Sequence, residues 1–178
     1  MAKDSEESTL GRQRGTDDAF TGRSAQLAVI AELLRRRCNA AIPEVDLGID
    51  VFAFKADRDE VVHIQVKACT TTHTYADGSG YSARFSLPVK QLDAPERRTA
   101  LYYVLAVLRD DHWIDFLIVS RKRLKSIFRS GQPFGFHNPK NDNLEIAVEF
   151  REMVTISGQE LTDCRNAWES LPPFRPEA

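Results

Sequence analysis

Three side chains in the segment 47–69 could do chemistry together, because a carboxylate and an amide oxygen can hold a cation and an ammonium group can stabilise negative charge. Asp50 stands at the head of a run of β-branched and aromatic residues, and Gln65 and Lys67 lie within a second such run. Side chains of a strand alternate between the two faces of its sheet, so Gln65 and Lys67 share one face. We therefore expect a carboxylate, an amide oxygen and an ammonium group to converge beside one strand end.

The pattern Asp-(X)14-Gln-X-Lys, preceded by an amphipathic helix, resembles the PD-(D/E)XK nuclease superfamily. In that family a strand Asp and the acidic residue of the (D/E)XK motif hold Mg²⁺, and the Lys assists attack by water. The resemblance places Asp50 and Lys67 at the first and last positions, with Gln65 at the usually acidic one. Some members, among them a group of intron-homing endonucleases and the methylation-dependent restriction enzymes, also have Gln there.

A second motif precedes the first. The segment 22–26, Gly-Arg-Ser-Ala-Gln, looks like the opening G-R-x-A-E of resolvase-like members, whose Glu reaches toward the metal. Gln26 takes the place of that Glu, and it falls inside the apolar arc of the predicted helix. A buried amide without a partner costs about 1–3 kcal/mol, so Gln26 is expected to bond a neighbour. Glu32 points away from this arc and is not expected to replace it.

The family resemblance implies a Mg²⁺ site, with Mn²⁺ as a substitute. Asp50 would supply a charged oxygen, and the Gln65 amide and the Val66 backbone carbonyl would supply neutral ones, which are ligands that suit Mg²⁺. Lys67 would orient the attacking water or stabilise the developing charge. Since Gln65 and Gln26 are both neutral, we expect weaker Mg²⁺ binding than in a site with acidic residues.

Two functions remain open. The first is a Mg²⁺-dependent endonuclease that hydrolyses DNA phosphodiester bonds in defence, recombination or mobile-element processing. The second is a catalytically weak or inactive nuclease-fold module that binds nucleic acid or a protein partner. Taken singly, Asp50 can close a strand-start turn and Gln65 and Lys67 can form a solvated strand face; the joint pattern favours the nuclease fold.

Hydrophobic periodicity predicts an α/β fold with one domain over residues 22–171. Residues 1–21 are polar and are expected to form a disordered arm, and 172–178 form a Pro-rich tail. The family resemblance makes this a restriction-endonuclease-like core, with a central mixed β-sheet flanked by helices. The expected helices are 22–38, 121–129 and 157–171, with a helical turn at 88–93, and the expected strands are 51–54, 61–69, 81–87, 101–108, 113–119 and 144–150.

The net charge of −2 does not by itself indicate a nucleic-acid-binding protein. A local basic cluster on the helix 121–129 can either track a DNA backbone or form an ordinary solvated face; it comprises Arg121, Lys122, Arg123 and Lys125. DNA is the expected partner, and a homodimer is left open beside a monomer. Three scattered cysteines and the lack of an apolar run of about 20 residues favour a cytoplasmic protein without membrane contact.

Overall fold

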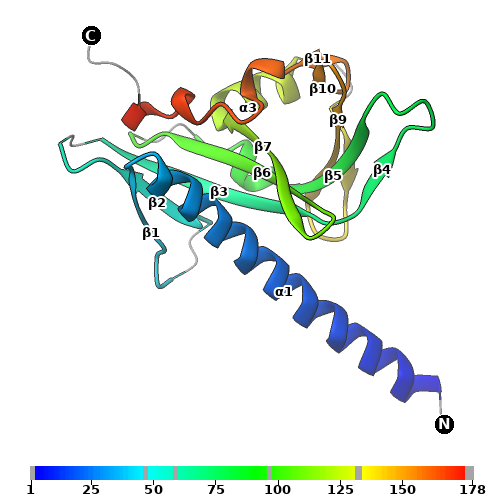
Figure 1. Ribbon diagram of the computed structural model, residues 1–178. Coiled ribbons are helices and arrows are strands. Elements are labelled where there is room, and N and C mark those ends of the chain that lie inside the picture. Colours follow the sequence, from blue (N-terminus) through cyan, green and yellow to red (C-terminus); the bar gives the residue numbers. More distant parts are fainter. Residues whose placement is uncertain (1–2, 46–47, 58–59, 96–97, 131–133, 175–178) are drawn as a thin grey trace.

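The computed structural model describes residues 3–45, 48–57, 60–95, 98–130 and 134–174, and it shows a mixed α/β fold with two β-sheets (Figure 1). The described helices are α1 (Lys3–Arg35), α2 (Val89–Leu92) and α3 (Arg121–Arg129). The first sheet has the order β1-β2-β3-β6-β7; its strands are β1 (Asn39–Ala41), β2 (Val51–Phe54), β3 (Val61–Cys69), β6 (Leu101–Arg109) and β7 (His112–Ser120). The second sheet has the order β11-β10-β9-β5-β4, with β8 also paired to β9; its strands are β4 (Thr72–Thr74), β5 (Tyr81–Pro88), β8 (Phe136–Asn138), β9 (Asn143–Phe150), β10 (Val154–Ile156) and β11 (Gln159–Glu160).

The first sheet is mixed because β3 and β6 run parallel while its other pairs are antiparallel. A parallel pair needs a crossover connection, and here that connection includes β4, β5 and α2. The β2–β3 pair is in register with Val51 opposite Ile64, which places Asp50 just beyond the paired part of β2. The strands expected at 51–54, 61–69 and 101–108 are thereby confirmed.

Helix α1 packs on one face of the first sheet through a narrow stripe. Ala25, Val29 and Leu33 are fully buried there, at spacings of four residues. Helical periodicity places Leu27 and Leu34 on the apolar arc of the predicted helix, but in the structure they are 52% and 53% exposed. The broad apolar arc predicted from the sequence was wrong at these two positions, because the sheet contacts only one side of the helix.

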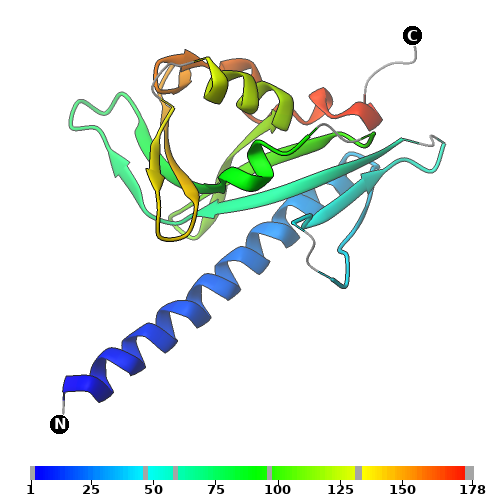
Figure 2. The same cartoon turned by 180° about the vertical axis from the view of Figure 1, so that it is seen from behind.

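Helix α1 also begins much earlier than expected. The backbone is helical from Lys3, where the sequence predicts a disordered arm. The N-terminal half of α1 extends away from the body of the molecule (Figures 1 and 2). Helix propagation adds one hydrogen bond for each residue that is ordered, so a helix anchored by packing at one end extends readily.

The opposite face of the first sheet is covered by the second sheet and by α3. Strands β5 and β9 pair over eight residues, from Tyr81 opposite Phe150 to Pro88 opposite Asn143, and their inward side chains pack against β6 and β7. The sequence predicts one central sheet flanked by helices, and that arrangement was wrong on this face. The pairing joins strands about sixty residues apart, and a local pattern carries no information about it.

The helix predicted over 157–171 was also wrong. Ser157 and Gly158 both have positive φ angles, 50° and 79°, and they form the tight turn of the β10–β11 hairpin. Three short 3₁₀ turns follow, at Thr162–Cys164, Trp168–Ser170 and Pro172–Phe174. The last of them lies in the predicted tail, whose residues 175–178 are outside the described chain.

A buried ionic cluster joins the two sheets away from the candidate site. The Asp115 carboxylate on β7 accepts hydrogen bonds from Arg165 Nε at 2.6 Å and Nη2 at 3.0 Å, and also from the Tyr81 hydroxyl. Asp115 is almost completely buried, so these donors compensate its charge. In the described part of the chain, no helix is both long and apolar enough to cross a membrane.

Candidate functional site

The centre of the candidate site is the Asp50 carboxylate, which lies directly before β2, at the end of the pairing between β2 and β3. The Asp50 backbone N–H donates to Ile64 O at 2.8 Å, which holds the residue against β3. Its carboxylate accepts hydrogen bonds from Gln26 Nε2 at 3.0 Å, from the Val66 backbone N–H at 2.6 Å, and from Gln65 Nε2. The structure thus brings Asp50, Gln65 and Gln26 together, with Gln26 approaching from α1.

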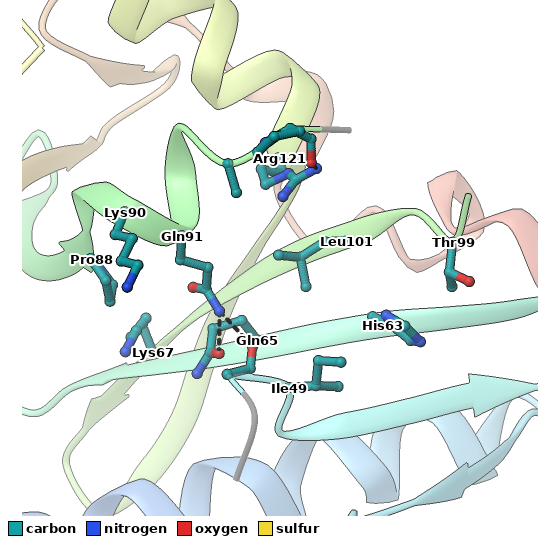
Figure 3. Close-up of a pocket in the computed structure, with 13 residues that line it drawn as sticks. Ile49, His63, Gln65, Lys67, Pro88, Lys90, Gln91, Thr99, Leu101 and Arg121 are labelled. Carbon is teal, nitrogen blue, oxygen red and sulfur yellow. Dashed lines mark hydrogen bonds between the residues drawn. The ribbon is translucent and has the colours of Figure 1, made fainter. Parts of the chain in front are cut away.

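Lys67 lies on the same face of β3 as Gln65. Gln65 and Lys67 both line one cavity (Figure 3), whereas Ile64 and Val66 point to the opposite face and pack with α1. Gln65 is only 7% exposed and Lys67 is half-buried. Asp50 is not itself a lining residue of the cavity; its hydrogen bond to Gln65, which lines the cavity, connects the two.

Gln91, on α2, is a member of the site that the sequence did not reveal. Its Nε2 donates to the Gly48 backbone oxygen and, over 3.0 Å, to Gln65 Oε1 (Figure 3). Its Oε1 accepts from the Tyr103 hydroxyl at 2.9 Å. Burial raises the pKa of the Tyr103 phenol, so this hydroxyl remains a neutral donor. Gln91 belongs to no motif, and no sequence signal would have found it.

These contacts determine which end of the Gln65 amide faces Asp50. A backbone carbonyl can only accept a hydrogen bond, so Gly48 fixes the position of the Gln91 NH₂ group. Because the Gln91 NH₂ group donates to Gln65, the side-chain oxygen of Gln65 must face Gln91. The NH₂ group of Gln65 therefore faces Asp50. We call this chain of contacts, formed by Gly48, Gln91, Tyr103, Gln65 and Asp50, the amide relay.

The ligand chemistry suits a hard cation, but the orientation of the amides opposes one. Asp50 and Gln65 offer side-chain oxygens, and the Val66 carbonyl lies at the same strand edge as the N–H that Asp50 accepts. However, the Asp50 oxygens face N–H groups, and Gln65 Oε1 faces Gln91. The residues therefore fit Mg²⁺ once the amide of Gln65 turns its oxygen toward Asp50, while Gln26 can keep its hydrogen bond to the other carboxylate oxygen. Among the described residues, no three His, Cys, Asp or Glu side chains are grouped to hold a metal.

The cavity beside the site has a volume of about 550 Å³ and a basic lining. Its cationic side chains are Lys67, Lys90 and Arg121, and His63 adds a titratable ring (Figure 3). The described lining residues include no Asp or Glu; they are Gly48, Ile49, His63, Gln65, Lys67, Pro88, Lys90, Gln91, Ala94, Pro95, Thr99, Leu101 and Arg121. The cavity therefore favours an anionic ligand.

The basic helix α3 contributes one of its four predicted DNA-binding residues to this cavity. Arg121 is buried, donates to Pro95 O at 2.9 Å and lines the cavity. Arg123 binds Asp163, and its hydrogen bonds hold the pKa of that carboxyl below its ordinary value. Lys125 donates to the backbone oxygens of residues 93 and 94, and Lys122 is exposed. Arg123 and Lys125 thus tie α3 to neighbouring loops.

No family model, curated protein or solved structure matches this chain.

Proposed function

We propose that the protein is a metal-dependent nuclease with a restriction-endonuclease-like core that hydrolyses phosphodiester bonds of DNA. The observation that carries this proposal is the cluster of Asp50 and Gln65 beside Lys67, at the edge of a cavity with a basic lining. The element order supports the proposed core, because α1 is followed by β1, β2 and β3, and then by a crossover to the parallel strand β6.

Each residue has a role that follows from its position. Asp50, Gln65 and the Val66 carbonyl would hold the cation. A bound Mg²⁺ or Mn²⁺ ion supplies a Lewis acid that neutralises charge on the phosphoryl oxygens. Lys67 projects into the cavity, where its ammonium group can stabilise a phosphoryl oxygen or orient the attacking water. Gln26 holds the second oxygen of Asp50 from the helix side.

A second function is favoured by one specific contact pattern. The N–H groups of Gln26, Gln65 and Val66 already satisfy the Asp50 carboxylate, and a cation must compete with them. A protein with this site can bind nucleic acid in the cavity and leave the phosphodiester bond intact. The alternative is therefore a nucleic-acid-binding module with a silent nuclease site.

Cleavage assays distinguish the two functions. Labelled single-stranded and duplex DNA is incubated with the wild type in Mg²⁺ or Mn²⁺, and with the variants Asp50→Asn and Lys67→Ala. Removing one group that stabilises the transition state lowers turnover by about 10²–10³-fold, and we expect at least this loss in both variants. The matched control is Lys140→Ala, which removes an exposed lysine from the turn before β9.

Thermal unfolding of each variant separates a chemical effect from a folding defect. Asp50→Asn keeps the side-chain size, whereas Asp50→Ala removes the acceptor of three N–H groups and is less suitable. Cleavage that persists in both folded variants, or that resists EDTA, contradicts the proposed site. DNA binding by the wild type without cleavage in either metal supports the module.

A further inference from the structure

We propose that the cavity beside Gln65 and Lys67 receives one unpaired nucleotide, so that the protein acts on single strands or single-stranded overhangs and not within a continuous duplex. This inference deepens the proposed function by naming its substrate class. The binding step rests only on the cavity, and it can be tested without cleavage.

The charge of the lining selects a phosphate-bearing ligand. Lys67 and Lys90 both line the cavity on the side where Pro88 lies (Figure 3), and Arg121 lines it from the start of α3. The described lining residues carry no carboxylate, although acidic residues outnumber basic ones in the whole chain, 26 to 24. Two ammonium groups and a guanidinium around one space attract the charge of a phosphate group.

The remainder of the lining suits a base and a sugar. Ile49 and Leu101 form an apolar wall between the two lysines and the far end of the cavity, where His63 and Thr99 lie (Figure 3). An apolar wall can pack against the face of any base, and the polar side chains beyond it can form hydrogen bonds with the base edge or the sugar. The two lysines can therefore receive the phosphate, and the apolar and polar side chains beyond them can receive the base and the sugar.

The cavity is too small to enclose a duplex. Its volume of about 550 Å³ is that of a small-molecule pocket, whereas the major groove alone of a DNA duplex is roughly 12 Å wide. Gln65 is only 7% exposed, so a phosphate must enter the cavity to reach it. A paired strand holds its nucleotides in the stack, and an unpaired strand can place one nucleotide inside at lower cost.

The test measures binding in EDTA, where the proposed hydrolysis cannot proceed. Fluorescence anisotropy compares a short single-stranded DNA oligomer, the single-stranded RNA of the same sequence, the blunt DNA duplex, and a duplex with a single-stranded overhang. We expect the single strands and the overhang to bind at least about tenfold more tightly than the blunt duplex. The two single-stranded arms show whether DNA or RNA is preferred.

Two variants test whether the nucleotide binds in the cavity. Lys90→Ala removes an exposed ammonium group from the phosphate end, and we expect roughly tenfold weaker single-strand binding, with Lys140→Ala as the charge-matched control. Ala94→Trp fills the cavity from its wall, and we expect it to abolish single-strand binding while thermal unfolding shows a folded protein.

The outcomes separate this inference from the proposed function. Equal affinity for the single strand and the blunt duplex, no binding of either, or unchanged binding in both Lys90→Ala and a folded Ala94→Trp overturns the inference. Metal-dependent cleavage within a blunt duplex, without preference for single strands, also overturns it and retains the nuclease. Selective single-strand binding that is lost in the two variants supports the inference even if no strand is cleaved in Mg²⁺ or Mn²⁺.

Discussion

Gln91 donates a hydrogen bond from Nε2 to Oε1 of Gln65 over 3.0 Å, and this contact decides what Gln65 presents to Asp50. Because the oxygen of Gln65 is engaged by Gln91, its NH₂ group is directed at the carboxylate. The state described by the structure is therefore a hydrogen-bonded carboxylate. Conversion to a cation site requires the amide of Gln65 to turn over, which breaks the hydrogen bond that its oxygen accepts from Gln91.

Gln65→Glu is expected to raise the affinity for divalent cations at least about tenfold. The new side chain keeps the length of Gln65 and can still accept from Gln91, but it adds a negative charge beside Asp50. Without a cation the two carboxylates repel each other, so we expect the apo variant to unfold about 1–3 kcal/mol more easily. Titration calorimetry with Mg²⁺ and Mn²⁺ measures the affinity, and Asp50→Ala is the control that should not bind. An unchanged affinity would show that Gln65 is not a ligand and would favour the binding module.

Gly48→Ala is expected to disrupt the amide relay. A Cβ at this position would lie 2.7 Å from Gln91 Nε2, and Gly48 has a φ of +77° that disfavours any side chain. The matched control is Gly158→Ala, because Gly158 has a φ of +79° and a Cβ there would meet nothing within 4 Å. Both changes carry the backbone penalty of about 1–2 kcal/mol. We expect a further loss only in Gly48→Ala, measured as the free energy of unfolding in urea; equal losses would mean that Gln91 moves aside freely.

Gln91 and Tyr103 are expected to be energetically coupled. Gln91→Leu leaves the buried Tyr103 hydroxyl without its acceptor, and Tyr103→Phe leaves Gln91 Oε1 without its donor, so each single change should cost about 1–3 kcal/mol. The double variant should cost less than the sum of the two, by about 0.5–3 kcal/mol. Urea unfolding of the four proteins in the cycle gives this difference. Strictly additive effects would contradict a direct interaction between the two side chains.

Alkaline pH is expected to destabilise the protein through Tyr103. Burial raises the pKa of this phenol above its ordinary value of 10.0, so the folded state keeps a proton that the unfolded state releases. Stability from this group is complete below pH 10 and falls as the pH rises above it, by up to about 1.4 kcal/mol per pH unit. Tyr103→Phe should show a shallower loss of stability above pH 10, in unfolding experiments at a series of pH values. Parallel curves for the two proteins would contradict this assignment.

The sequence by itself determined the strands around the site and the meeting of Asp50 with Gln65. The run 51–54 is continuously apolar, and in the run 61–69 apolar and polar residues largely alternate, so both are predicted strands. A short polar segment joins them, and they pair as neighbours. Antiparallel pairing of neighbours fixes the register over a short loop, and the position of Asp50 beside Val66 follows from it. Gln26 is close to this pair because α1 buries the stripe that contains Ala25 and Val29.

Only the tertiary structure decided what the Asp50 cluster is bonded to and what the cavity is made of. The two ends of a glutamine amide are nearly equal in size, so nothing local selects which one faces Asp50; Gly48 and Gln91 select it, and Gln91 is 26 residues from Gln65. The second sheet, the C-terminal 3₁₀ turns and the burial of Arg121 likewise depend on contacts between segments far apart in the chain. Such contacts form only when the whole chain has closed its loops, and a pattern of nearby residues does not encode them.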